Sequence, residues 1–129
     1  MMKFNCNKIV HPQEIEVWHV IPAIRRELAN EMKKRNMEQK AIASMLGITE
    51  AAISQYLNKK RAIKIVFSKR LKKEISLATD KIIKEKSETT VLQEIQRIMD
   101  LPKMREQVCK IHQECECVKK NCMLCRDKN

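Results

Sequence analysis

The residues with the greatest potential for chemistry are cysteines, and they crowd toward the end of the chain. Five of the six, Cys109, Cys115, Cys117, Cys122 and Cys125, fall within residues 109–129. Thiolates this close together repel one another unless a bound cation or cluster stabilises them. The first residues lack the apolar stretch of an export signal, so we expect a reducing compartment, where clustered thiols bind metal or carry out redox chemistry.

Three kinds of chemistry fit this cysteine-rich tail. The first is an iron–sulfur cluster, most simply 4Fe–4S, held by four of the five cysteines with Cys122 and Cys125 as the firmest pair. The second is a structural zinc ion, Zn2+, bound by Cys109, His112, Cys122 and Cys125, although the nine residues between its two halves are few for common zinc folds. The third is a metal-free thiol switch, which lacks the strand and helix context of thioredoxin. Irregular spacing and a surplus cysteine favour the cluster, and so a redox or iron–sulfur sensor.

A second pattern lies in residues 39–61, QKAIASMLGITEAAISQYLNKKR, with Gln39, Ala43, Gly47 and Ile53 as its fixed points. A small residue at 43 opposite a compact aliphatic residue at 53 lets two short helices cross closely, and glycine at 47 lets the backbone reverse without a steric penalty. The pattern resembles the helix-turn-helix of lambda-repressor and Cro-like (XRE-type) regulators. With VWHVIPAIRREL before it and the cysteine-rich tail after it, the chain is similar to a group of small predicted regulators from archaea.

The resemblance implies which residues meet DNA. In that family the second helix enters the major groove and presents its first turn to base edges. It implies that Gln55 pairs with adenine, that Glu50 accepts from cytosine and that the Ala51 methyl touches a thymine methyl, while Gln39 and Ser54 contact phosphate or assist readout. The full set of implied DNA-contacting residues is Gln39, Thr49, Glu50, Ala51, Ser54, Gln55, Asn58, Lys59, Lys60 and Arg61. The plainer alternative is a pair of packed helices with no DNA-binding role.

The charge balance favours a partner rich in phosphate. Lys and Arg outnumber Asp and Glu by 27 to 16, a formal net charge of +11, and residues 59–73 hold eight basic residues and no acidic one. No apolar run is long enough to cross a bilayer, and no pattern typical of an enzyme occurs. We therefore expect a cytoplasmic, non-enzymatic regulator bound to double-stranded DNA. The competing class is a small iron–sulfur electron carrier with an acidic protein partner, which would not show the steep salt dependence of duplex binding.

Helices must position these residues, because one glycine and 3% aromatic residues disfavour sheets and predict an all-α fold. Apolar spacing predicts a main helix over 22–35 after a turn of helix at 15–20, with Pro22 dividing or kinking the two. It also predicts short helices over 38–46 and 49–58 and a long helix over 67–86. Further helices are expected after a cap at Thr89 or Thr90 and from Pro102, and the pattern dissolves from residue 112 onward.

Three parts follow from this order of elements. We expect a lambda-repressor-like helix-turn-helix DNA-binding domain over 1–63, a helical dimerisation and connecting region over 64–108, and a cysteine-rich metal or iron–sulfur binding tail over 109–129. One recognition helix reads few base pairs, so we expect a homodimer that places two of them roughly 34 Å apart on a pseudo-palindromic operator. Dimer contacts are expected in helices after residue 66, where a change in the cluster would alter the spacing or tilt of the two recognition helices.

Overall fold

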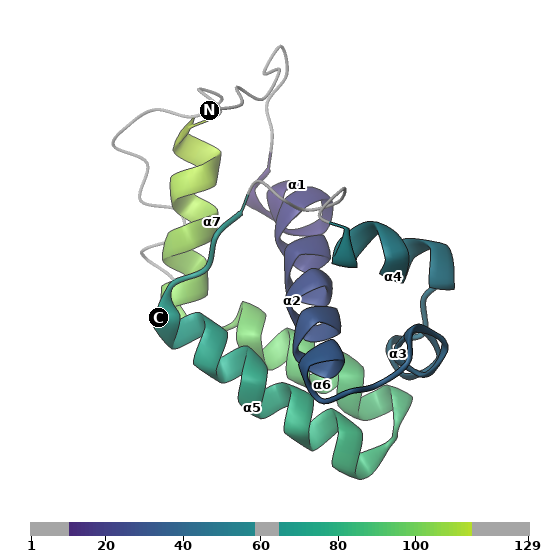
Figure 1. The fold of residues 1–129 in the computed structure, drawn as a ribbon. Coiled ribbons are helices and arrows are strands. Elements are labelled where there is room, and N and C mark those ends of the chain that lie inside the picture. Colours follow the sequence, from purple (N-terminus) through teal and green to yellow (C-terminus); the bar gives the residue numbers. More distant parts are fainter. Residues whose placement is uncertain (1–10, 59–64, 115–129) are drawn as a thin grey trace.

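The fold is all-α, as the sequence predicts. A computed structural model describes residues 11–58 and 65–114, in which every regular element is helical (Figure 1). The elements are α1 (Pro12–Ile15), η1 (Glu16–Val20), α2 (Ile21–Lys34), α3 (Gln39–Leu46), α4 (Glu50–Leu57), α5 (Lys69–Glu85), α6 (Glu88–Met99) and α7 (Pro102–Glu114).

The chain from Pro12 to Lys34 is one unbroken helical stretch, so the expected interruption at Pro22 is wrong. His11 caps its start, because the His11 Nδ1 accepts from the Gln13 amide at 3.1 Å and the Glu14 carboxylate accepts from the His11 amide at 3.0 Å. The middle section, η1, is a π-helix in which the Ile21 amide bonds to the Glu16 carbonyl five residues earlier. A wider turn directly before Pro22 accommodates a residue that has no amide hydrogen and crowds the preceding turn.

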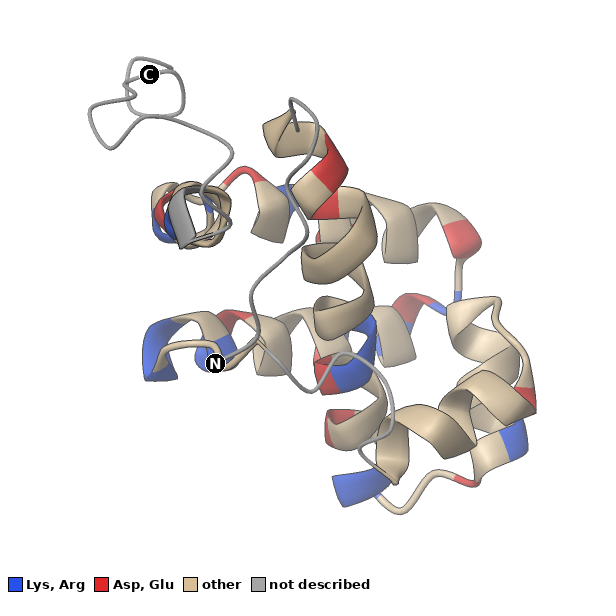
Figure 2. Cartoon of the chain, turned by 90° about the horizontal axis from the view of Figure 1, so that it is seen from above, with Lys and Arg blue, Asp and Glu red and all other residues tan. Residues whose placement is uncertain are grey.

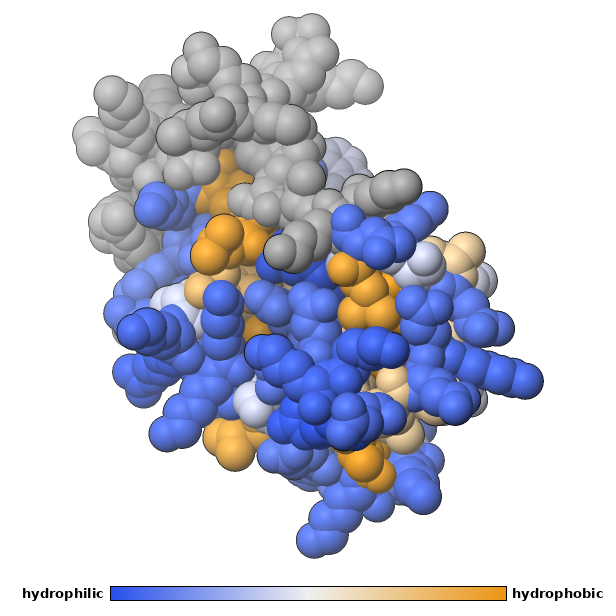
Figure 3. Space-filling view, viewed as in Figure 1, coloured by the Kyte–Doolittle hydropathy of each residue, from blue (hydrophilic) through white to orange (hydrophobic). Residues whose placement is uncertain are grey.

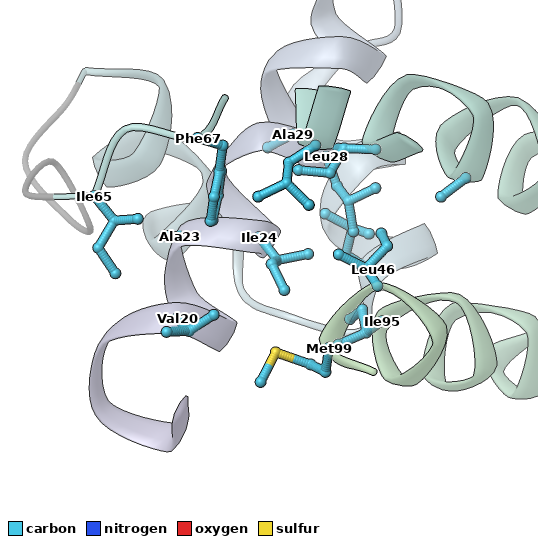
Figure 4. Packing of buried hydrophobic residues seen from close by; sticks show 14 of the residues in the cluster. Val20, Ala23, Ile24, Leu28, Ala29, Leu46, Ile65, Phe67, Ile95 and Met99 are labelled. Carbon is cyan, nitrogen blue, oxygen red and sulfur yellow. The ribbon is translucent and has the colours of Figure 1, made fainter. Parts of the chain in front are cut away.

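Helix α2 lies at the centre of the hydrophobic core. It packs against α3 and α4 and against α5, while α5 also packs against α6, and α7 contacts α1 (Figure 1). Figure 4 shows Phe67, from the segment before α5, beside Ala23 of α2, and Leu46 of α3 approaching Ile95 and Met99 of α6. The buried apolar side chains of α1 through α7 form one cluster, which runs without a break across residue 63, where the sequence predicts a division.

Ion pairs tie α5 to its neighbours. Arg97 of α6 donates to Glu74 of α5 at 2.6 Å and to the buried Glu94 at 3.1 Å. The hydrogen bond from Glu74, together with that from Glu94, raises the pKa of Arg97 despite partial burial. At the other side of α5, Asp80 accepts from the Arg35 Nε at 2.9 Å, which fixes the end of α2.

Two predicted helix starts need correction. The long helix begins after Ser68, whose hydroxyl accepts from the Leu71 amide at 3.3 Å, so Phe67 precedes the helix although it fits the apolar spacing. The next helix has Ser87 as its N-cap residue, not Thr89 or Thr90, and Thr90 is instead buried and donates to Glu85 at 3.2 Å. The start of α7 at Pro102 agrees with the prediction.

The surface is mostly hydrophilic. In the face shown in Figure 3, the apolar residues form small areas separated by polar and charged ones. None of the helices in the described ranges combines the length and the apolar character that a membrane span requires.

Candidate nucleic-acid interface

The turn between α3 and α4 is built by Gly47. Gly47 has φ 68° and ψ 32°, the left-handed conformation that ends a helix with least cost in glycine. The Ile48 amide donates to the Ala43 carbonyl at 3.0 Å, and the Gly47 amide donates to the Ser44 carbonyl at 3.3 Å, so the last carbonyls of α3 are satisfied. The sequence prediction of a helix-ending glycine at 47 is confirmed.

Thr49 starts α4 as the sequence predicts. Its hydroxyl accepts from the Ala52 amide at 3.1 Å, which satisfies one of the free amides at the start of the helix. Glu50 follows in the first turn, where a carboxylate is stabilised by the positive end of the helix dipole. The start of α4 is therefore fixed by its own sequence.

Ala43 and Ile53 have the burial that a close helix crossing requires. Ala43 is 5% exposed and Ile53 is 0% exposed, both belong to the core cluster, and α3 packs against α4. Tyr56, one turn after Ile53, is also buried. Helix α4 thus has an inner side held by α2 and α3 and an outer side left open.

The outer side of α4 presents the residues that the sequence nominates. Thr49, Glu50 and Ala51 are exposed, and Ser54 and Gln55 are half-buried. Exposed Asn58, directly after the helix, donates from its side-chain amide to the Ser54 hydroxyl at 3.3 Å. Gln39, the first residue of α3, is half-buried in the same two-helix unit. Lys59, Lys60 and Arg61 lie outside the described residues.

The basic residues are divided between two sides of the molecule. Lys40 is exposed on α3 beside Gln39, and sequence reasoning passed over it although it directly follows the first residue of the motif. Lys69, Arg70, Lys72 and Lys73 are exposed in the first turns of α5. Figures 1 and 2 place that end of α5 at the opposite edge of the molecule from α3 and α4. The basic stretch of residues 59–73 therefore does not continue as one strip beside α4.

Only the beginning of the proposed metal site falls within the described residues. Cys109 and His112 are both buried and lie one turn apart on α7. Cys115, Cys117, Cys122 and Cys125 lie outside the described residues. Within those residues no three potential ligands come together. The ligand set of the tail stays a prediction.

Comparison with known families agrees with this geometry. A family model described as helix-turn-helix matches residues 28–76, from the second half of α2 through α3 and α4 into α5. Comparison with curated proteins and with solved structures gives no match. The matched range includes the capped first turn of α4, the glycine turn and the crossing of α3 with α4.

Proposed function

Because residues 28–76 form a lambda-repressor-like (XRE-type) helix-turn-helix domain, which makes the chain a DNA-binding transcription regulator, we propose that it acts as a homodimeric repressor on a pseudo-palindromic operator. The observation that carries the proposal is the exposed first turn of α4, held by the Thr49 cap on one side and the buried Ile53 on the other. Repression follows because a dimer seated on a promoter blocks access to it.

The outer side of α4 suits base reading better than phosphate binding. Its residues 50–57 include one acidic residue, Glu50, and no basic one, so its polar groups are neutral acceptors and donors with one carboxylate. Gln55 can form two hydrogen bonds with adenine, and Glu50 can accept from cytosine. Phosphate contacts fall to the start of α3, where Gln39 and the exposed Lys40 lie at the positive end of a helix.

Operator selection followed by single substitutions tests the reading assignment. We expect Gln55→Ala to weaken binding to the selected operator by roughly 10-fold or more and to relax preference at one base pair, because a two-bond contact discriminates by about 1–3 kcal/mol. Gln93→Ala is the matched control, since Gln93 is an exposed glutamine on α6. If Ser54→Ala with Gln55→Ala left selectivity unchanged in the presence of bulk competitor DNA, α4 would not be the reading helix.

We further propose that Cys109, Cys115, Cys117, Cys122 and Cys125 supply the ligands of an iron–sulfur cluster, with a zinc ion held with the help of His112 as the alternative. The donors on α7 fit either group, because Cys109 and His112 lie three residues apart on buried positions of one helix. A bound cluster would supply sensitivity to redox state or iron supply. A route to the DNA-binding unit exists, since α7 packs on α1, and α1 continues into the α2 helix that supports α4.

Anaerobic purification with metal analysis and a visible absorption spectrum tests the cluster. We expect a coloured protein containing iron, and loss of that colour in Cys122→Ser. Cys6→Ser is the control, because Cys6 lies outside the tail and is not a proposed ligand. A colourless, iron-free protein with one equivalent of zinc would remove the sensor proposal and leave the DNA-binding proposal in place.

A further inference from the structure

Two large apolar side chains lie exposed and adjacent on η1. Val17 is 61% exposed and Trp18, the only tryptophan in the chain, is 54% exposed. A tryptophan left this open in a folded protein is uncommon, and tryptophans dominate the binding energy at the centres of protein interfaces. The π-helical turn gives these residues a local geometry that an α-helix would not, and such turns recur at functional sites.

The other exposed leucines of the described ranges are solitary. Leu77 of α5 has charged neighbours on the adjacent turns, Lys73, Glu74, Asp80 and Lys81. Leu92 of α6 is bordered by Glu88, Thr89 and Gln96 on its outer side. Single apolar residues of this kind are ordinary on protein surfaces. The pair on η1 differs because its two members are continuous.

The helices expected to form the dimer have their apolar faces already covered. The stripe of α5, Leu71, Ile75, Ala78 and Ile82, is buried, and α5 packs on α2 and α6. The apolar residues of α6 belong to the same core. A homodimer needs an apolar contact elsewhere, and η1 offers it.

The local charge also favours a second copy at this place. Residues 12–20 contain Glu14 and Glu16 and no Lys or Arg, in a chain of net charge +11. Two such chains repel each other over most of their surface, and that repulsion is least where acidic residues replace basic ones. Val66, also exposed, lies near this end of α2, because the Arg26 guanidinium donates to the neighbouring Ile65 carbonyl at 2.8 Å.

The position leaves the reading turn free. In Figure 1, α4 runs from its connection with α3, at one edge of the molecule, toward the end of α2 next to α1. Its exposed first turn therefore faces away from η1. A partner docked on η1 would lie beside the last turn of α4 and would not cover Thr49, Glu50 or Ala51.

We propose that Val17 and Trp18 form the centre of the homodimer interface and pack against the same two residues of a second copy of this chain. The inference rests on the proposed homodimeric regulator and moves its dimer contact from the helices after residue 66 to the π-helical turn. Two-fold symmetry makes the patch its own partner.

The single tryptophan gives a direct test in the full-length protein. We expect the emission of Trp18 to shift to shorter wavelength as protein concentration rises, in step with a monomer-to-dimer change in mass by sedimentation. Val17→Glu should hold the emission at long wavelength, and both Val17→Glu and Trp18→Glu should weaken dimerisation by roughly 30-fold or more, the effect of losing an interface hot spot. Leu92→Glu, an equally exposed position on α6, should leave the dimer intact.

Each outcome decides between interface and function. A wild-type chain that stays monomeric, or a dimer that persists in both η1 variants, would overturn the inference, as would dissociation by Leu92→Glu alone. Circular dichroism checks the fold of each variant, and Trp18→Gln replaces Trp18→Glu if a buried charge prevents folding. Monomeric variants that keep the base preference at a single half-site would support both proposals, whereas a concentration-dependent dimer with no selective DNA binding would support the interface and reject the regulator.

Discussion

Enlarging Ala43 to leucine should separate α3 from α4. Ala43 is 5% exposed within the core, and its carbonyl accepts the Ile48 amide at 3.0 Å, so the same residue sets both the helix crossing and the turn. Three added carbons have no free volume there, and overpacking a core position costs about 1–3 kcal/mol. At roughly 4 °C per kcal/mol for a chain of this size, Ala43→Leu should lower Tm by about 4–12 °C.

The matched control is two residues away. Ala41 lies on the same helix but is exposed, so Ala41→Leu should change stability by no more than about 0.5 kcal/mol. Thermal unfolding followed by circular dichroism measures both variants, and operator titration measures the displacement of α4. Operator affinity should fall in Ala43→Leu by more than in Ala41→Leu at a temperature where both are folded. Equal melting temperatures for the two variants would refute the close crossing.

Four further changes can be measured by urea unfolding. Gly47→Ala should lower stability by about 1 kcal/mol from backbone strain alone, since no atom lies within 4 Å of the added Cβ, and a larger loss would point to crowding. Lys86→Gly should raise it by about 1 kcal/mol, because Lys86 ends α5 with φ 53°; no gain would contradict strain at that position. Thr49→Ala should cost about 1 kcal/mol through loss of the cap, and a neutral result would make the 3.1 Å bond irrelevant to stability. Burial opposes ionisation of Glu31, but hydrogen bonds from Lys34 and Arg35 outweigh it and hold the pKa of Glu31 below its ordinary value. Its contribution is therefore present at neutral pH and is lost as pH falls below about 4, so Glu31→Gln should reduce stability at about pH 7 and show a smaller further loss in acid.

The helix-turn-helix was predictable because its signals are local. Gly47, Thr49 and the spacing of Ala43 and Ile53 each act within a few residues, and backbone conformation and capping depend on little else. The all-α fold followed from the same kind of information. These features would form in much the same way in any chain that carries them.

The errors arose where distant contacts decide. Phe67 fits the spacing of α5, but it precedes the Ser68 cap and packs beside α2 from an extended segment. Thr90 is a good capping residue by type, yet burial and a bond to Glu85 give it another role. The basic residues of α5 adjoin those near α4 in sequence and lie at another edge in space. Periodicity along a chain does not contain that information.

The shared core also bears on how the molecule loses its structure. Ile53 under the recognition helix and Ile111 near the end of α7 belong to one apolar cluster, so neither end can melt without disturbing the other. We expect a single cooperative transition, and we expect a fragment cut after residue 63 to leave the α5-facing side of α2 open to water. The DNA-reading half is therefore unsuited to transplantation by itself, and any ligand that tightens α7 raises the global resistance to unfolding felt at α4.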